Sequence, residues 1–467
     1  MKEDTICAIS TPPGIGGIAV ARISGSRAIE ITDSIWQGRP LAQAASHTAH
    51  LGLVKDKSGN ELDQVVATVF RSPRSFTGED VVEISVHGSK YVQRELIASL
   101  IHAGARLAEA GEFTRRAFAS GRMDLAEAEA VADVIASNSR AAHRIAISQM
   151  RGGFSRRLAE LRSRLVDLAS LLELELDFSE EEVEFASRDQ ITQLARDLHN
   201  EISRLHRSFA KGNAIKEGIP VAIVGATNAG KSSLLNALLG DDRAIVSDIH
   251  GTTRDTIEET IEIGDYQFRF IDTAGIRHTA DRIEQIGIDR SLQAIDKARI
   301  IIMVIDPTSE LPHDLIKRLA HPSTEPADGL LPHTIVAINK ADIATDQDLN
   351  NTHNALDTLL PQAKTLHISA MNGQGIATLT QAIEQAAATD TGNADEDILV
   401  TNARHAQALA QALDSTTRLL QGLDASLPGD LLAQDLRETL HHLATITGQI
   451  PSTEILATIF SRFCIGK

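Results

Sequence analysis

Cysteine, aromatic residues and long apolar runs are scarce in this sequence. Its two cysteines, Cys7 and Cys464, stand near opposite ends of 467 residues, so a disulfide framework is not expected. Aromatic residues make up 3%, which favours aliphatic, helix-rich cores. No apolar run reaches the roughly 18 to 20 residues that a membrane span needs, and the first residues do not start a signal peptide. We therefore expect a cytoplasmic protein with reduced thiols and no membrane partner.

Positive charge is also in deficit. The chain has 45 lysines and arginines against 63 acidic residues, which gives a formal net charge of −18. Broad, non-specific binding of nucleic acid requires many cations to replace counterions. Any RNA contact is therefore expected to be local, or shared with a more basic partner.

A glycine-rich loop follows the apolar residues 219–224 and precedes a helical pattern. The loop, Gly225-Ala-Thr-Asn-Ala-Gly-Lys-Ser232, has the order that forms a phosphate cradle, in which backbone N–H groups and the helix N-terminus face an anion. Lys231 would contact the β and γ phosphates, and Ser232 would bind Mg2+. The sequence thus predicts a P-loop nucleotide site.

Two segments after the loop have the character of nucleotide switches. Gly251-Thr-Thr-Arg-Asp255 offers a threonine hydroxyl to the metal, and Thr253 is favoured over Thr252. Asp272-Thr-Ala-Gly275 ends an apolar stretch, so that Asp272 can reach the Mg2+ shell and the Gly275 N–H can sense the γ phosphate.

Two later segments predict guanine recognition. In Asn339-Lys-Ala-Asp342, the Asp342 carboxylate can accept from the ring N–H and the exocyclic amine of guanine, a donor pair that adenine lacks. Ser369 and Ala370 follow another predicted strand and would direct a backbone N–H to the guanine O6. Five such segments in order at strand ends predict a GTPase.

The residue after the Asp-x-x-Gly segment leaves the hydrolysis mechanism open. It is Ile276, which cannot orient the attacking water as a glutamine does in Ras-type enzymes. Acidic residues of the segment Asp281-Arg-Ile-Glu284 are one substitute. The other is a monovalent cation bound beside the phosphates by the Asn228 amide oxygen, although Asn228 could equally only brace the loop.

The flanks of the GTPase segment predict two further domains. Residues 1–120 alternate short strands and helices, as in a small α/β domain, with Arg22 and residues 75–80 as polar groups at strand ends. Residues 121–214 and 389–467 show amphipathic helical periodicity, for example at Leu158, Leu161 and Leu165. Neither helical flank looks complete by itself. We therefore expect one all-α domain into which an α/β P-loop (Ras-like) domain, residues 215–388, is inserted.

Blocks across the chain resemble one family. They are Thr11-Pro-Pro-Gly-Ile-Gly-Gly17, Gly111-Glu-Phe-Thr-Arg-Arg-Ala-Phe118, the GTPase segments and the terminal Cys464-Ile-Gly-Lys467. Together they look like the tRNA modification GTPase family MnmE, also called TrmE, over essentially the whole chain. The resemblance implies a hydrolase of GTP to GDP and phosphate. It also implies an FAD-containing partner, MnmG (GidA), with which an aminomethyl-type group is installed at carbon 5 of the wobble uridine of certain tRNAs.

The resemblance further implies cofactors and assembly. The one-carbon unit would come from formyl- or methylene-tetrahydrofolate, and glycine or ammonium would supply the amine. The chain would form a homodimer through its N-terminal domains, and K+ would stimulate dimerisation of the GTPase domains. At Thr227 the family commonly has proline, a departure that removes no ligand.

Site residues carry over by position. The folate site would comprise Arg22, Glu79, Arg122 and Lys467, and K+ would be bound by Asn228, Ser247, Ile249 and Thr252. Glu284 would orient the water through a bridging water, Lys231 would act on the phosphates and Cys464 would be needed for modification. The residues expected around GTP and Mg2+ are Asn228, Ala229, Gly230, Lys231, Ser232, Ser233, Ser247, Asp248, Ile249, His250, Gly251, Thr252, Thr253, Asp272, Thr273, Ala274, Gly275, Asn339, Lys340, Asp342, Ser369 and Ala370.

Two rival functions remain at this point. A ribosome-assembly or other RNA-associated regulatory GTPase would need a basic RNA-binding module, against which the acidic composition counts. A folate-dependent aminomethyltransferase with a merely regulatory GTPase would bind folate through residues 1–120 and turn over without a partner.

Overall fold

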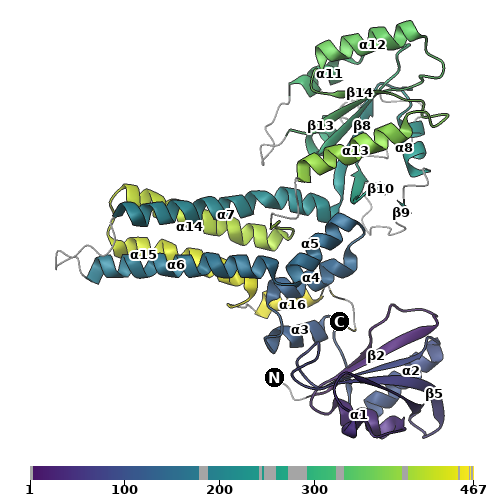
Figure 1. Cartoon of the computed structure of the whole chain (residues 1–467), viewed down its shortest axis with the longest axis vertical. Helices are drawn as coiled ribbons and strands as arrows, with labels where there is room; N and C mark the ends of the chain where they lie inside the picture. Colours follow the sequence, from purple (N-terminus) through teal and green to yellow (C-terminus); the bar gives the residue numbers. More distant parts are fainter. Residues whose placement is uncertain are drawn as a thin grey trace. The chain divides into compact units, whose positions relative to one another are not determined.

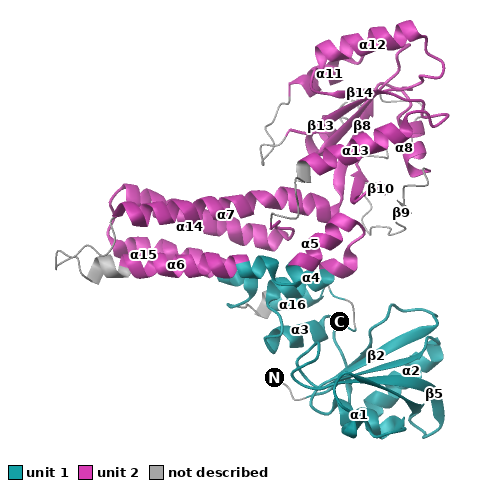
Figure 2. Ribbon diagram, viewed as in Figure 1, with its two compact units in different colours: residues 1–132, 149–156, 444–467 teal, residues 133–148, 157–443 magenta. Residues whose placement is uncertain are grey.

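The computed structural model describes residues 4–177, 188–240, 245–246, 259–271, 292–321, 331–391, 398–450, 453–461, 463 and 466. The chain divides into two compact units, residues 1–132, 149–156 and 444–467 in one and residues 133–148 and 157–443 in the other (Figure 2). The division at residues 120, 214 and 388 stays a prediction. Among the described residues, no helix is long and apolar enough to cross a membrane.

The first unit contains a seven-stranded sheet with the order β3-β4-β5-β6-β2-β1-β7. Helices α1 (Ala28–Ile35) and α2 (Lys90–His102) share one core with it. In the long strand β5, Val65 and Val69 point into that core while Val66, on the opposite face, is 38% exposed, as the two-residue period of a strand requires. The strands are β1 Ile6–Ile9, β2 Ile18–Ser24, β3 Trp36–Gln37, β4 Thr48–Lys55, β5 Glu61–Phe70, β6 Val81–His87 and β7 Arg106–Leu107.

The C-terminal end of the chain belongs to this first unit. Helices α3 (Glu112–Ala119), α4 (Leu125–Ala136) and α16 (Thr453–Ser461) lie near one another, and Leu125 shares a small core with Phe460 and Phe463. The Ser10 hydroxyl donates to the carbonyl of Gly466 at 3.0 Å. The tail therefore packs at the end of β1.

The helical domain is built from both sides of the GTPase segment. Helix α7 precedes that segment and α14 follows it, and the two pack against each other (Figure 1). His199 of α7 hydrogen-bonds Thr416 of α14 at 3.2 Å. The leucines expected on one face of α6, Leu158 to Leu172, are all buried. The helices are α5 Arg140–Met150, α6 Gly153–Asp177, α7 Arg188–Glu217, α14 Ala403–Asp424 and α15 Gly429–Thr447. The predicted fold, an all-α domain with an inserted Ras-like GTPase domain beside an α/β domain, is confirmed.

The GTPase domain contains a second seven-stranded sheet with the order β14-β13-β12-β8-β11-β10-β9. Alternate residues of β12 (Ile300–Ile305), the neighbour of the central strand, enter two cores, Ile302 on one face and Met303 on the other. Both faces are therefore covered, by α8 and α13 on one side and α11 and α12 on the other.

The elements of this domain match the expected strand and helix order. They are β8 Ile219–Gly225, α8 Lys231–Leu239, β9 Ile245–Val246, β10 Glu259–Ile263, β11 Tyr266–Phe270, β12 Ile300–Ile305, α11 His313–Ala320, β13 His333–Ile338, α12 Asp346–Leu359, β14 Lys364–His367 and α13 Ile376–Thr391. Strands β8, β11, β12, β13 and β14 are parallel, so their carboxyl ends meet at one edge.

Candidate functional site

The glycine loop leaves the central strand β8 at Gly225, and α8 begins at Lys231. Gly230 has φ 100°, and a Cβ atom there would lie 2.1 Å from Asn339 Nδ2, so a larger residue does not fit without displacement. Asn228 is exposed and has φ 62°. The strand, tight loop and helix therefore occur in the order that the P-loop pattern predicted.

Lys231 points back into the loop. Its Nζ donates to the carbonyls of Gly225 at 2.9 Å and Ala226 at 2.8 Å. Burial lowers the pKa of Lys231, because desolvation disfavours the charged form. Since both carbonyls are neutral, a phosphate group would add a counter-charge that they do not provide.

These groups fit a magnesium nucleotide. Ser232 is half-buried in the first turn of α8, where a hydroxyl can bind a hard cation and the helix N–H groups can receive phosphate oxygens. Ser233, the next residue, is exposed. When bound, Mg2+ would supply charge to the phosphates, while the chain itself supplies the cradle.

Asn339 joins three predicted segments. This side chain is 3% exposed. Its Nδ2 donates to the Ala229 carbonyl at 2.8 Å, and its Oδ1 accepts from the Ala370 N–H at 2.9 Å. The amide thereby ties the P-loop to the Ser369-Ala370 segment and braces both loops.

Lys340 and Asp342 follow β13 at the same edge. Lys340 has φ 62°, and its Nζ donates to Asp306 Oδ2 at 2.6 Å. Burial alone would raise the pKa of Asp306, but hydrogen bonds from Lys340 and Thr308 hold it below the usual value. Asp342 is exposed, as a guanine-reading carboxylate at a loop must be.

The other predicted nucleotide and cation positions lie outside the described residues. They are Ser247, Asp248, Ile249, His250, Gly251, Thr252, Thr253, Asp272, Thr273, Ala274, Gly275 and Glu284. The P-loop, Asn339, Lys340, Asp342, Ser369 and Ala370 form the part of the site whose arrangement is seen.

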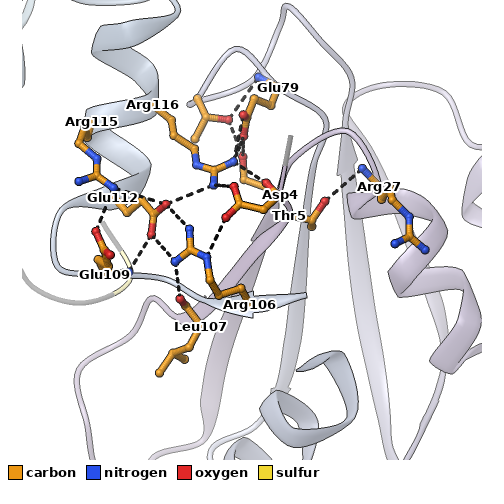
Figure 3. Close-up of polar contacts among 12 residues, drawn as sticks. Asp4, Thr5, Arg27, Glu79, Arg106, Leu107, Glu109, Glu112, Arg115 and Arg116 are labelled. Carbon is orange, nitrogen blue, oxygen red and sulfur yellow. Dashed lines mark hydrogen bonds and ion pairs between the residues drawn. The ribbon is translucent and has the colours of Figure 1, made fainter. Parts of the chain in front are cut away.

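A second polar cluster lies in the first unit, around Glu79 (Figure 3). The Glu79 carboxylate accepts from Arg116 Nη1 at 3.1 and 3.2 Å and from the Ser24 hydroxyl at 2.7 Å. Arg116 also donates to Asp4 at 2.9 Å and to Glu112 at 3.2 Å. This guanidinium therefore fixes one carboxylate of the predicted folate site.

Arg106 shares two carboxylate partners, Asp4 and Glu112, with Arg116. Its guanidinium bonds Asp4 Oδ2 at 2.8 Å and Glu112 Oε1 at 2.6 Å. Glu112 is 3% exposed. Burial would raise its pKa, yet the two guanidiniums and the Glu109 N–H keep it lowered. Asp4, Glu79 and Glu112 are thus each paired with at least one guanidinium.

Two further predicted folate residues lie beside the segment that carries Glu79. Arg22 bonds Glu83 at 2.8 Å and stacks over Phe76 and Phe113, with its Cζ 5.0 and 5.6 Å from the ring centroids. The exposed Arg122 has its Cγ 3.2 Å from where a Cβ on Gly78 would stand. Lys467 lies outside the described residues.

Of the two cysteines, Cys7 is the one that lies in the described part of the chain. Cys7 is buried in the core of the first unit, and burial raises the pKa of its thiol to about 11. At neutral pH this thiol stays protonated and is a poor nucleophile. Cys464, the cysteine predicted to act in modification, lies outside the described residues.

Several residues that shape these sites were not expected from the sequence. The bracing role of Asn339, the pairing of Asp306 with Lys340 and the network around Arg116 were not predicted. A weak signal was present for one of them, because Glu112 and Arg116 are four residues apart and face each other on a helix.

Known protein families and relatives match nearly the whole chain. The sequence model of the MnmE helical domain matches residues 125–464, and that of the GTP-binding protein TrmE N-terminus matches residues 5–122. A solved structure of Era in complex with MgGDPNP and nucleotides of 16S ribosomal RNA is 25% identical, over 42% of this chain and 66% of its own, with a TM-score of 0.27.

Full-length relatives are more similar. The tRNA modification GTPase MnmE of Parabacteroides distasonis is 49% identical over 477 residues, which cover 99% of this chain and 100% of that protein. The protein of the same name in Bacteroides fragilis is 46% identical over 478 residues and the full length of both. The chain therefore belongs to the tRNA modification GTPase MnmE family and is a GTP hydrolase of tRNA modification.

Proposed function

We propose that this GTPase is stimulated by potassium and drives modification of the wobble uridine of certain tRNAs. With an FAD-containing partner, MnmG, it would install an aminomethyl-type group at carbon 5, using a one-carbon unit carried by formyl- or methylene-tetrahydrofolate. The reaction would take place in the cytoplasm. The observation that carries this proposal is the coexistence, in one chain, of a braced P-loop and a separate arginine and glutamate cluster.

Within the GTPase domain, each proposed role follows from position. Lys231 and the loop amides, including Asn228 to Ser233, would hold phosphate, Ser232 and Thr253 would bind Mg2+, and Asp342 would read guanine. The support is that Lys231 bonds only neutral carbonyls among the contacts above, and that Asn339 aligns the guanine loop with the P-loop.

A potassium ion would replace the missing catalytic side chain. Ile276 offers no hydrogen bond to water, whereas Asn228 is exposed at the loop with φ 62° and carries an amide oxygen that suits a monovalent cation. Ser247, Ile249 and Thr252 would complete the shell, and Glu284 would orient the water. Dimerisation of the GTPase domains would bring this arrangement together.

The folate would bind in the first unit, in a homodimer formed by the N-terminal domains. Arg22 and Glu79 carry opposite charges, and the half-buried Phe76 adds aromatic surface near Arg22, a combination suited to a planar heterocycle with an acidic tail. Arg122 and Lys467 would contribute further positive charge, and Cys464 would act in the modification step.

Steady-state GTP hydrolysis in KCl and in NaCl, at equal ionic strength, tests the potassium proposal. We expect turnover at least ~10-fold higher in potassium, equivalent to about 1.4 kcal/mol of barrier. Asn228→Ala should abolish the potassium gain and Glu284→Ala should abolish turnover. Equal rates in both salts would show that the mechanism is wrong.

Folate binding is tested separately, by titrating the full-length protein with 5-formyl-tetrahydrofolate in a calorimeter. Arg22→Ala should abolish the binding heat, whereas Arg27→Ala, which removes an exposed arginine paired with Glu30, should leave it unchanged. A wild-type protein that binds no folate would contradict this part alone.

A further inference from the structure

A cavity of about 1130 Å3 lies in the second unit, at the amino ends of β12, β13 and β14. Its lining includes the residues where these strands begin, among them Arg299, His333 and Lys364. Because these strands run parallel to β8, this edge is opposite to the one that carries the P-loop. We call this space the basal cavity.

The basal cavity is basic although the chain is acidic. One carboxylate, that of Asp296, occurs among its described lining residues, and it is bound to Arg318. Three histidines also line the space, His206, His321 and His333. The lining lysines and arginines are Arg207, Lys297, Arg299, Arg318 and Lys364.

Three of these cations are exposed, and two of them bond to neutral partners. Lys364 Nζ donates to the neutral amide of Gln385 at 3.0 Å, and Arg207 donates to the Ser203 hydroxyl at 2.8 Å. Lys297 is also exposed and lines the cavity. Neutral partners orient a cation without cancelling its charge, so the positive potential remains available to an anion.

We propose that the basal cavity binds backbone phosphates of the tRNA. The family acts on tRNA, yet a chain of net charge −18 can hold a polyanion only where cations are locally in excess. Phosphate contacts fix the position of a nucleic acid without reading its sequence. The cavity would thus position the tRNA on the GTPase domain while the nucleotide edge stays free. This inference rests on the tRNA modification activity, and not on potassium stimulation or folate binding.

The test is the affinity of the full-length protein for fluorescein-labelled tRNA, measured by fluorescence anisotropy from about 50 to 200 mM salt, the range over which phosphate contacts lose affinity steeply. The variant carries Lys297→Glu and Lys364→Glu together. We expect at least ~10-fold weaker binding, and a slope of log affinity against log salt that is smaller by about 1.4 to 1.8, the value for two lost phosphate contacts.

A matched variant controls for net charge. It carries Lys57→Glu and Lys317→Glu, two exposed lysines that do not line the cavity, and changes the net charge by the same amount. This control should bind tRNA like the wild type. Both variants should hydrolyse GTP at the wild-type basal rate, because neither pair touches the P-loop.

Three results would overturn the proposal. The control could weaken binding as much as the cavity variant, which would indicate long-range charge alone. The wild type could fail to bind tRNA at the lowest salt. Finally, the cavity variant could keep its tRNA affinity while losing affinity for a fluorescent polyglutamate peptide, which would assign the cavity to an acidic protein. In each case an unchanged rate of GTP hydrolysis would show that the GTPase activity of the family does not depend on this proposal.

Discussion

Asn339 and Ala229 are 110 positions apart in sequence, yet the Asn339 side-chain amide donates to the Ala229 carbonyl at 2.8 Å. The same side chain accepts from the Ala370 N–H at 2.9 Å. A single buried amide thus sets the spacing between the loop expected to hold phosphate and the loop expected to hold guanine. Nucleotide affinity should depend on this residue although it need not touch the nucleotide.

Asn339→Ala should weaken GDP binding and destabilise the GTPase domain. The substitution leaves the Ala229 carbonyl and the Ala370 N–H buried without this partner, at a cost of about 1 to 3 kcal/mol for each unpaired group. Binding of a fluorescent GDP analogue and the thermal unfolding midpoint measure the two effects. Asn236→Ala, at an exposed position of α8, should change neither, and equal behaviour of the two variants would contradict the bracing role.

Gly230→Ala should abolish nucleotide binding. The new Cβ would lie 2.1 Å from Asn339 Nδ2 at a residue with φ 100°, so both collision and backbone strain oppose it. Gly373→Ala separates the two causes, because Gly373 has φ 81° with nothing within 4 Å. The control should cost only about 1 kcal/mol of stability, from the strain of positive φ. Binding of a fluorescent GDP analogue measures both variants. If Gly230→Ala loses no more nucleotide affinity than Gly373→Ala, the collision is relieved by side-chain movement.

Arg116→Ala should destabilise the first unit strongly. It removes the guanidinium from the half-buried Glu79 and from the buried Glu112, which keeps Arg106 as a partner. Losing hydrogen bonds to charged groups costs about 1.5 to 3 kcal/mol. Arg115→Ala is the matched control, because Arg115 is 43% exposed and pairs mainly with the exposed Glu109. Its effect should stay within about 1 kcal/mol. Hydrogen exchange of the β1 and β2 amides measures the stability of the first unit in both variants. Equal protection in the two variants would show that the Arg116 contacts do not stabilise this unit.

Arg116→Lys would then separate positioning from folding. A lysine keeps the charge but cannot reach Asp4, Glu79 and Glu112 together with one ammonium. We expect this variant to fold and to bind 5-formyl-tetrahydrofolate more weakly than the wild type. Unchanged folate affinity would show that Arg116 has no effect on the site beyond folding.

Acid should weaken the GTPase domain through Asp306. The Lys340 and Thr308 hydrogen bonds lower the pKa of Asp306 below its model-peptide value of 3.8. A carboxylate with a lowered folded pKa stabilises the fold fully above the unfolded pKa, and this contribution is lost as pH falls through the folded pKa. The unfolding midpoint of the wild type should therefore drop below about pH 4 more steeply than that of Asp306→Asn. Parallel curves would contradict the assignment.

Local patterns predicted the elements of this fold closely. The apolar residues 219–224 expected before the glycine loop are β8 Ile219–Gly225, and the helical pattern expected after it is α8 Lys231–Leu239. Apolar periodicity is a property of neighbouring residues, so it can be read from the chain directly. The P-loop follows for the same reason, because its glycines, lysine and serine are contiguous.

Contacts across the fold could not be predicted in this way. Arg22 was expected at a strand end as a ligand group, but its pairing with Glu83 depends on the antiparallel register of β2 and β6, in which these residues are opposite each other. Likewise, the bond from Asn339 to Ala229 needs the strand order of the sheet. Such contacts appear only when topology has brought distant segments together.

The docking of Gly466 on Ser10 has a consequence for biosynthesis. The first unit includes residues 1–132 and also residues 444–467, and Phe460 and Phe463 complete a core with Leu125. The ribosome synthesises a chain from the N-terminus to the C-terminus, at about 5 to 20 residues per second. The residues around Leu125 therefore stay incompletely packed until the ribosome has made the last part of the chain. A chaperone that shields them during this interval should raise the yield of folded protein.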